Sequence, residues 1–179
     1  RINDGLSYPY QMTLGAITND SLISEMGCQI AEQCTRIGIN VNFAPDIDVN
    51  NEPNNPVIGF RSFGEDPDNV ARKGTAYALA LQNNGVLPSM KHFPGHGNTK
   101  TDSHHALPII KNSLEEIEKI ELYPFQYAID KGVKGAMVGH LYFPALEPVV
   151  NKSSSLSKNI VTDLLKDKEY GFYDFGNLL

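Results

Sequence analysis

The feature that most constrains the fold is an alternation of amphipathic segments with short apolar ones. Apolar residues recur at helical spacing in four segments, 20–37, 67–83, 113–131 and about 155–168. Between them lie three short runs with strand character, 39–49, 86–92 and 133–141. Repetition of helix and strand in units of roughly 45 residues predicts parallel strands joined by crossover helices that cover both faces of the sheet.

Local signals mark where several of these helices begin and end. Asp66 is a good N-cap and Pro67 suits the first helical position. Ser113 and Glu116 have the spacing of a capping box at the start of the third helix. Pro124 lies inside that helix and is expected to kink or divide it, because proline lacks the backbone donor that a helix interior needs.

Titratable residues gather where the expected strands end. They are Asp46 and Asp48, then Lys91 and His92, then His140. In a (β/α)8 barrel this is the catalytic face. A complete barrel takes about 250 residues, so we expect an incomplete TIM-barrel-like α/β fold of central β/α units, with residues 1–179 forming part of a single domain. No Gly-rich nucleotide motif is present, which leaves a nucleotide-binding open sheet as the weaker alternative.

Composition narrows the possible partners. The formal net charge is −6 and no Lys/Arg run offsets it, so a nucleic-acid partner is not expected. No apolar run is long enough for a membrane span. Cys28 and Cys34 are expected to be unpaired core residues, since six residues along a helix they point in different directions. A cytoplasmic, periplasmic or secreted location, and the oligomeric state, stay open.

The window 91–108, KHFPGHGNTKTDSHHALP, holds four of the five histidines. Asp102 stands two residues before His104, so its carboxylate can orient that imidazole for proton transfer. The alternative is a solvated histidine beside a loop carboxylate. Lys91 and His92 can donate hydrogen bonds to substrate hydroxyls if the backbone bends near the turn at 94–95. The alternative is a surface lysine and a core histidine.

Arg61 follows two proline turns in an asparagine-rich stretch, and lies in the segment GFRSFGEDP. Its planar fork suits bidentate contact with adjacent sugar hydroxyls or a carboxylate, although pairing with Glu65 or Asp66 is the more common fate of a loop arginine. Asp46 and Asp48 could contact substrate or order this arginine, and we expect the second. The hypothesis of a metal site is supported by residue types that bind zinc, namely His92, His96, His104, His105 and Asp102. With no HExxH motif or cysteine pair, however, we expect neither metal nor cofactor.

The central window resembles glycoside hydrolase family 3, in its NagZ-type β-N-acetylglucosaminidase branch. The motifs that carry the resemblance are KHFPGHG (91–97), DSHHALP (102–108), FAPDIDVN (43–50), NPVIGFRSFGEDP (55–67), AMVGHLYFPALEP (136–148) and LSKNIVTDLLK (156–166). They extend over nearly the whole chain, which corresponds to the central portion of a longer barrel.

The resemblance implies retaining hydrolysis of terminal non-reducing β-linked N-acetylglucosamine from chitooligosaccharide or bacterial peptidoglycan fragments. It implies that His104 is the general acid/base and that Asp102 is its partner. The residues implied to bind the sugar are Lys91, His92, Arg61 and Arg1. A histidine base that is neutral when it works does not repel an anion, so phosphorolysis is a side hypothesis.

One part of the family pattern is missing. The family's nucleophile is an aspartate after a Gly-Phe pair, in a pattern like GFxGxxxSDD. Here Gly171 and Phe172 are followed by YDFGNLL, and Asp174 comes too early. We therefore expect little turnover from these residues alone. Two alternatives are kept: a non-catalytic carbohydrate-binding barrel fragment and a metal-dependent barrel hydrolase.

Overall fold

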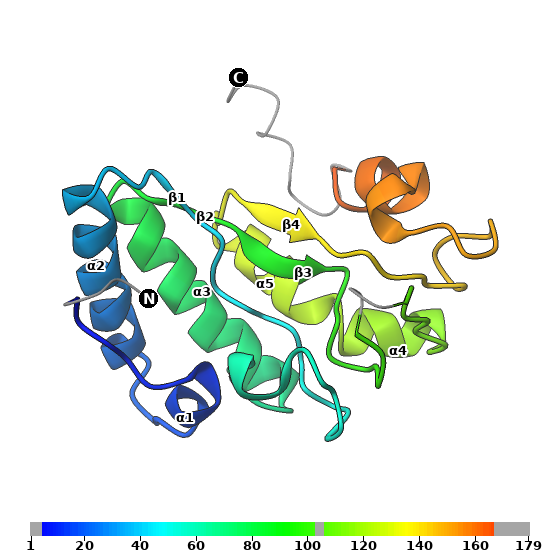
Figure 1. The fold of residues 1–179 in the computed structure, drawn as a ribbon, viewed down its shortest axis with the longest axis horizontal. Coiled ribbons are helices and arrows are strands. Elements are labelled where there is room, and N and C mark those ends of the chain that lie inside the picture. The colour runs from blue at the N-terminus through cyan, green and yellow to red at the C-terminus, as the bar shows by residue number, and fades with distance from the viewer. Residues whose placement is uncertain (1–4, 103–105, 167–179) are drawn as a thin grey trace.

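The fold was obtained as a computed structural model, which describes residues 5–102 and 106–166 (Figure 1). Its helices and strands follow in the order α1 (Gln11–Gly15), α2 (Ser21–Arg36), β1 (Val41–Asn42), α3 (Pro67–Asn83), β2 (Leu87–Pro88), β3 (Met90–Phe93), α4 (Leu114–Lys119), α5 (Tyr123–Asp130) and β4 (Ala136–Val138). Short 3₁₀ turns occupy Gly59–Arg61 and Ser154–Leu156, and a π-helical segment covers Asn159–Leu164.

The strands pair in parallel, as the alternation of elements predicts. β1 pairs with β2, and β3 pairs with β4. A parallel bridge between Asp46 and Lys91 continues the first pairing along the chain after β1. The strands are shorter than the runs expected from the sequence. The described residues thus form a mixed α/β fold, while closure into part of a TIM barrel remains a prediction.

Helix α3 is the central helix and packs between α2 and α5 (Figure 1). Its start agrees with the sequence signals, because the Asp66 side chain accepts a hydrogen bond from Asp68 N at 3.2 Å and Pro67 begins the helix. Its buried side includes Val70, Ala71, Tyr77, Ala78 and Leu81. This helix also contacts β2.

Pro124 divides the expected third helix into α4 and α5. The capping box at the start of α4 is confirmed, since Ser113 Oγ accepts from Glu116 N while the Glu116 carboxylate accepts from Ser113 N. In a continuous helix the ring of Pro124 would clash with the carbonyl of Ile120. The chain breaks there, and Pro124 lies in the first turn of α5.

The prediction of a single continuous helix at about 155–168 is wrong, because two separate helical segments are found there. The chain makes a 3₁₀ turn at Ser154–Leu156, becomes extended at Ser157, and then forms the π-helical segment. Ser157 accounts for the interruption, because its hydroxyl accepts from Ile160 N at 3.2 Å and donates to Glu147. A serine that caps a new helical segment must itself be non-helical. Residues 167 and 168 lie outside the described residues.

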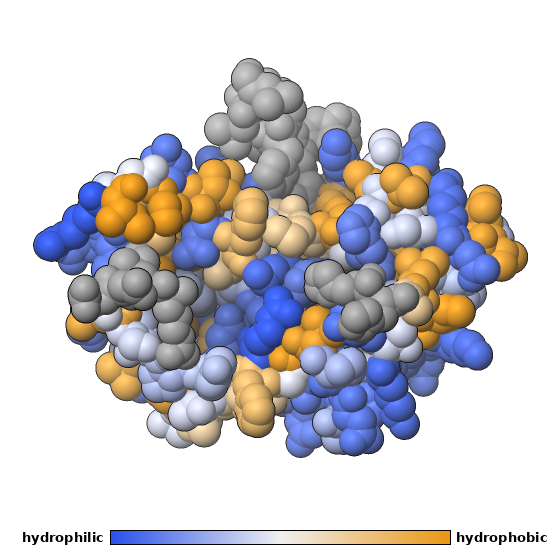
Figure 2. Space-filling view, viewed as in Figure 1, coloured by the Kyte–Doolittle hydropathy of each residue, from blue (hydrophilic) through white to orange (hydrophobic). Residues whose placement is uncertain are grey.

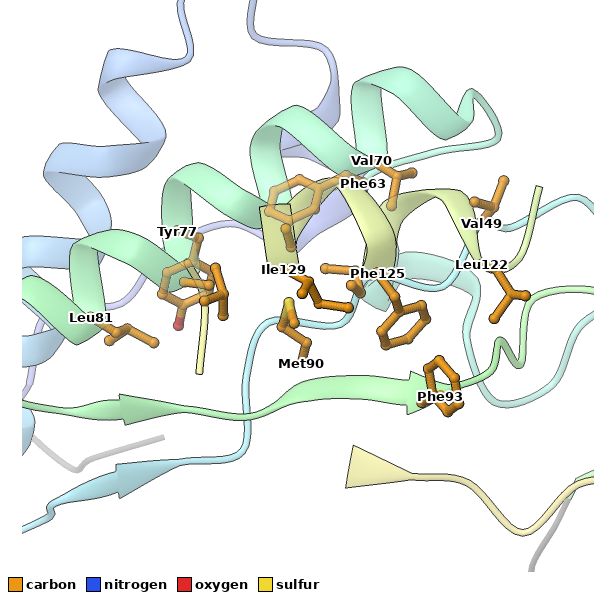
Figure 3. Close-up of a cluster of buried hydrophobic side chains, with 14 of the residues drawn as sticks. Val49, Phe63, Val70, Tyr77, Leu81, Met90, Phe93, Leu122, Phe125 and Ile129 are labelled. Atoms are coloured by element: carbon orange, nitrogen blue, oxygen red, sulfur yellow. The ribbon is translucent and has the colours of Figure 1, made fainter. Parts of the chain in front are cut away.

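The core gathers between α3, α5 and β3 (Figure 3). Phe93 at the end of β3 packs edge-on against Phe125 of α5, with ring centroids 5.2 Å apart. This contact fixes the end of β3 against the helical layer, so residues 91–93 have a rigid support.

The two cysteines are both free, as expected, but only Cys34 is a core residue. Cys28 is exposed, because six residues along α2 carry it to the outer side of the helix. Within the described residues, no helix is both long enough and apolar enough to span a membrane.

Candidate active site: a buried carboxylate pair that orders an arginine and two histidines

Three segments meet at one edge of the strand layer. The chain after β1 brings Asp46 and Asp48, β3 brings Lys91 and His92, and the 3₁₀ turn at 59–61 brings Arg61. The register of β3 with β4 shifts between Lys91 and Phe93, so the strand is irregular where the two polar side chains leave it. The bend needed to bring Lys91 and His92 to one region therefore lies inside β3.

Arg61 is ordered by Asp46. Its Nη2 atom lies 3.2 Å from Asp46 Oδ2 and 3.4 Å from His92 Nε2. The arginine thus pairs with Asp46, in the chain after β1, and within the described residues it forms no ion pair with its sequence neighbours Glu65 or Asp66. This geometry agrees with the expectation for Asp46, whereas Asp48 has the two histidines as its partners.

Asp48 accepts hydrogen bonds from three N–H groups. His92 Nδ1 lies 2.7 Å from Asp48 Oδ2, the His92 amide is 3.1 Å from Oδ1, and the His96 amide is 2.6 Å from Oδ1. A carboxylate at Nδ1 places the proton on that nitrogen, which leaves Nε2 of His92 as an acceptor facing Arg61. Asp48 therefore fixes the tautomer and direction of this imidazole.

The pKa values of the two aspartates shift in opposite directions. Burial raises the pKa of Asp48, but the hydrogen bond and charge of His92 outweigh it and bring that pKa down to about 2. Burial and the nearby charge of Asp48 raise the pKa of Asp46 well above its usual value, although Arg61 opposes this. The pair thus favours a charged Asp48 beside a carboxyl that more readily holds a proton.

Lys91 lines a groove of about 860 Å³ together with Asp46 and Arg61. Burial, followed by the charge of Arg61, lowers the pKa of Lys91, and its ammonium donates to the carbonyl of Phe43. Aromatic side chains line other parts of this groove, among them Tyr8, Tyr10, Phe43 and Tyr77. Figure 2 shows hydrophilic side chains gathered in the middle of this face, with hydrophobic ones beside them.

The turn after β3 is held by Asn55. Its Nδ2 donates to the carbonyls of His96 and Gly97, at 2.8 and 3.0 Å. Gly97 permits a close approach, since a Cβ there would lie 1.6 Å from the carbonyl oxygen of Val49. The buried His96 ring packs edge-on to His92 at 5.7 Å between centroids, and burial lowers its pKa.

The structure brings together three of the predicted site residues, Lys91, His92 and Arg61. Asp102 is half-buried, and its carbonyl accepts from Ala106 N at 3.1 Å. His104 and Arg1 lie outside the described residues, so the pairing of Asp102 with His104 and the sugar contact of Arg1 stay predictions. Sequence reasoning missed Asn55, because the run Asn-Asn-Pro indicates only a turn.

Asp46, Asp48 and His92 also have the spacing of a metal site, with one ligand atom from each lying within 4.8 Å of the others. The guanidinium of Arg61 lies 3.2 Å from one of these residues and 3.4 Å from another. A cation placed among them would meet that positive charge at close range. The donor set therefore suits the ordering of an arginine better than the holding of a metal ion.

These features, parallel strands with a polar cluster at their ends, are those of an α/β domain with a binding site at its strand edge. Comparison with known proteins identifies the family. Residues 1–174 match the glycosyl hydrolase family 3 N-terminal domain, and the chain belongs to this family.

Named relatives place the chain among β-N-acetylglucosaminidase-like members. It is 39% identical to β-hexosaminidase A of Pseudoalteromonas piscicida, over 93% of this chain and 30% of that protein. The glycoside hydrolase family 3 β-N-acetylglucosaminidase from Paenibacillus sp. str. FPU-7 is 43% identical, with a TM-score of 0.92 over 96% of this chain and 32% of that one.

NagZ from Neisseria gonorrhoeae, solved in complex with N-trifluoroacetyl-D-glucosamine, is 30% identical, with a TM-score of 0.86 over 96% of this chain and 51% of that one. The expected resemblance to this family is confirmed. The chain spans from about a third to about half of the length of these three relatives.

Proposed function

We propose that the protein containing this chain hydrolyses terminal non-reducing β-linked N-acetylglucosamine from glycosides. Family membership supports a glycosidase, and the relatives named β-hexosaminidase or β-N-acetylglucosaminidase support this sugar. The NagZ relative solved with N-trifluoroacetyl-D-glucosamine supports an amino-sugar ligand in the same fold. Chitooligosaccharides and peptidoglycan fragments both carry this terminal group.

The observation that carries the proposal is the pairing of Arg61 with Asp46 beside Lys91 in the groove. A guanidinium held by a buried carboxylate presents its remaining N–H groups in a fixed plane. An ammonium nearby adds a second donor that is partly removed from water. Adjacent sugar hydroxyls accept from such a set, so the arrangement suits a non-reducing terminal pyranose.

The proposed chemistry is retaining hydrolysis. In the first step a carboxylate attacks the anomeric carbon while an acid protonates the leaving oxygen. In the second step the group that gave this proton acts as a base and activates a water molecule, which hydrolyses the glycosyl–enzyme bond. His104 takes the acid/base part and Asp102 orients it. The nucleophilic carboxylate is not assigned, because Asp174 does not fit the family pattern and lies outside the described residues. These 179 residues alone are therefore expected to bind sugar and turn over little of it.

The acid role of His104 is tested in the intact protein with two kinds of substrate. We expect His104→Ala to lower kcat/KM on chitobiose by about 10²–10⁴, because its leaving group needs a proton. Activated aryl N-acetylglucosaminides need no such help and should lose far less. Equal losses on both substrates would contradict the acid role. Retention is checked by NMR of the product that forms first, and an inverted anomeric configuration would contradict it.

Binding separates this proposal from its alternatives. Calorimetry with N-acetylglucosamine should show binding to the wild-type protein and at least tenfold weaker binding to Arg61→Lys, which keeps the charge but loses the planar fork. Binding without hydrolysis by the intact protein would favour a non-catalytic carbohydrate-binding domain. Activity that disappears with chelator and returns with a divalent metal would favour a metal-dependent hydrolase.

A further inference from the structure

Glu121 is a buried acid that the proposed chemistry does not use. It lies at the corner between α4 and α5 and is 2% exposed. It backs directly onto the turn after β3, since a Cβ added at Gly95 would lie 2.6 Å from Glu121 Cβ. The corner and the turn therefore share a tight contact, with the carboxyl group enclosed beside it.

The surroundings of Glu121 favour its neutral form. Among the described residues, neither carboxyl oxygen has a hydrogen-bond partner. An ionised carboxylate in such a place would lose its hydration with only partial compensation from nearby amides. Burial accordingly raises the pKa of Glu121 to about 7; the amides of Asn51 and Asn98 offset part of this rise, and the charge of Glu116 on α4 adds to it.

The turn that rests on Glu121 continues directly from the polar cluster, which consists of Asp46, Asp48, Arg61, Lys91 and His92. It joins His92 at the end of β3 to His96, whose amide donates to Asp48. Asn55 holds the carbonyl side of the same turn. A displacement of the turn away from the α4–α5 corner would consequently disturb both histidines and the carboxylate that orders them.

We propose that Glu121 is a positioning residue that holds the turn at residues 94–97 in place as an uncharged group. Ionisation draws water toward the carboxylate and opens the contact with Gly95. The turn, together with the donors of the polar cluster, is therefore held in place at mildly acidic pH. It loosens as the pH rises above neutral. Only the consequence for sugar binding rests on the function proposed above.

The direction of the pH effect follows from proton binding. The folded protein keeps a proton on Glu121 that the unfolded chain releases between about pH 4.5 and pH 7. Stability falls across that window, and the loss is complete above it. Above about pH 7 the fraction of molecules with neutral Glu121 falls about tenfold per pH unit.

Hydrogen exchange of peptides spanning residues 91–98, in the intact protein from pH 5.5 to 9, tests the idea without a ligand. Rates are corrected for the intrinsic pH dependence of exchange. In the wild type, protection should fall by up to about tenfold per pH unit above about pH 7. Glu121→Gln, which has no charge to gain, should show nearly constant protection. Glu118→Gln, on the exposed side of α4, is the matched control and should behave as the wild type.

A wild-type profile in Glu121→Gln, or a flattened one in Glu118→Gln, would overturn the inference. If Glu121→Gln does not fold, Glu121→Met replaces it, because an apolar side chain of similar length suits a neutral site without hydrogen bonds. Affinity for N-acetylglucosamine over the same pH range should weaken in the wild type and stay level in the Gln variant. Absence of sugar binding at every pH would refute the proposed function and leave the exchange result to decide this one.

Discussion

Asp48 shows how one buried residue can organise a site. Its two oxygens accept from the ring and amide of His92 and from the amide of His96. Because these donors come from a strand end and the following turn, Asp48 ties the direction of a side chain to the position of the backbone. The neighbouring Asp46 does the same for Arg61.

Asp48→Asn should therefore destabilise the fold as well as misdirect His92. An amide has one acceptor oxygen and would turn its own NH2 toward the donors, which costs roughly 3 kcal/mol of unfolding free energy for a buried charged partner. Urea unfolding at pH 7 measures it. Since the pKa of Asp48 is lowered to about 2, its contribution is present above about pH 4 and is lost as the pH falls toward 2.

The control for Asp48→Asn is Asp130→Asn. Asp130 is exposed at the end of α5, where its carboxylate accepts from the Gln126 side chain. That variant should lose less than about 0.5 kcal/mol. Similar losses in the two variants, or a wild-type pH profile in Asp48→Asn, would show that the charge of Asp48 has no special part in the fold.

At this scale the sequence predicts which residues meet but not how each is supported. Asp46, Lys91 and His92 could be placed together because the ends of neighbouring parallel strands share one edge. Glu121 could not, because nothing in its local sequence distinguishes a buried acid from its exposed neighbours Glu115 and Glu118. Burial of that side chain depends on the approach of Gly95, which is 26 residues away along the chain.

Among the elements, helices α2 and α3 pack closely where two small residues face each other. A Cβ at Gly27 of α2 would lie 2.6 Å from Ala80 Cβ and 3.1 Å from the Tyr77 carbonyl on α3. Nearby, the buried Lys73 of α3 donates to the Asp20 carboxylate at the start of α2, at 2.6 Å. Small residues and an ion pair therefore set the separation of the two helices together.

Gly27→Ala is expected to destabilise the protein by about 1–3 kcal/mol, because the added methyl group overpacks the helix contact. This loss exceeds the roughly 1 kcal/mol that alanine gains over glycine inside a helix. Thermal and urea unfolding measure it. In the double variant with Ala80→Gly the clash is relieved, so the two changes should be less than additive.

Glu25→Ala, an exposed change in the same helix, serves as the control for Gly27→Ala and should be close to neutral. A stabilised Gly27→Ala would mean that helix propensity outweighs packing there. Strict additivity with Ala80→Gly would mean that the two side chains do not oppose each other.

Helix boundaries could be predicted well where a side chain caps the backbone, as at Asp66 and Ser113, because the capping bond is local in sequence. The strands could not, since their length depends on a partner strand and its register. The segment after Ser153 shows the same limit. Its interruption arises from a bond of Ser157 to Glu147, which helical periodicity does not contain.

For the whole molecule, the rhythm of the sequence predicted parallel strands with helical crossovers, and the pairings of β1 with β2 and of β3 with β4 agree. Barrel closure depends on strand tilt and shear, which periodicity does not determine. The described residues accordingly define the layers and one polar edge of the strands, whereas the number of strands around a barrel stays a prediction.

The edge of β1 leads to a prediction about the behaviour of the 179-residue chain by itself. Among the described residues, β1 pairs on one side only, with β2. Val41 in this strand is 45% exposed, and Ile39 and Phe43 on either side of it are 38% and 62% exposed. Unpaired edges with apolar side chains favour pairing between copies. We expect concentration-dependent self-association, measurable by sedimentation velocity in the range of tens of micromolar.

Val41→Lys should reduce this self-association, because a lysine on an edge strand must lose its hydration when another strand approaches. The change also moves the net charge from −6 toward zero, which by itself favours association. Val150→Lys, at a 74% exposed position away from β1, makes the same charge change and is the matched control. Reduced association in Val41→Lys alone would assign the effect to the edge, whereas equal behaviour of the two variants would assign it to charge or to another surface.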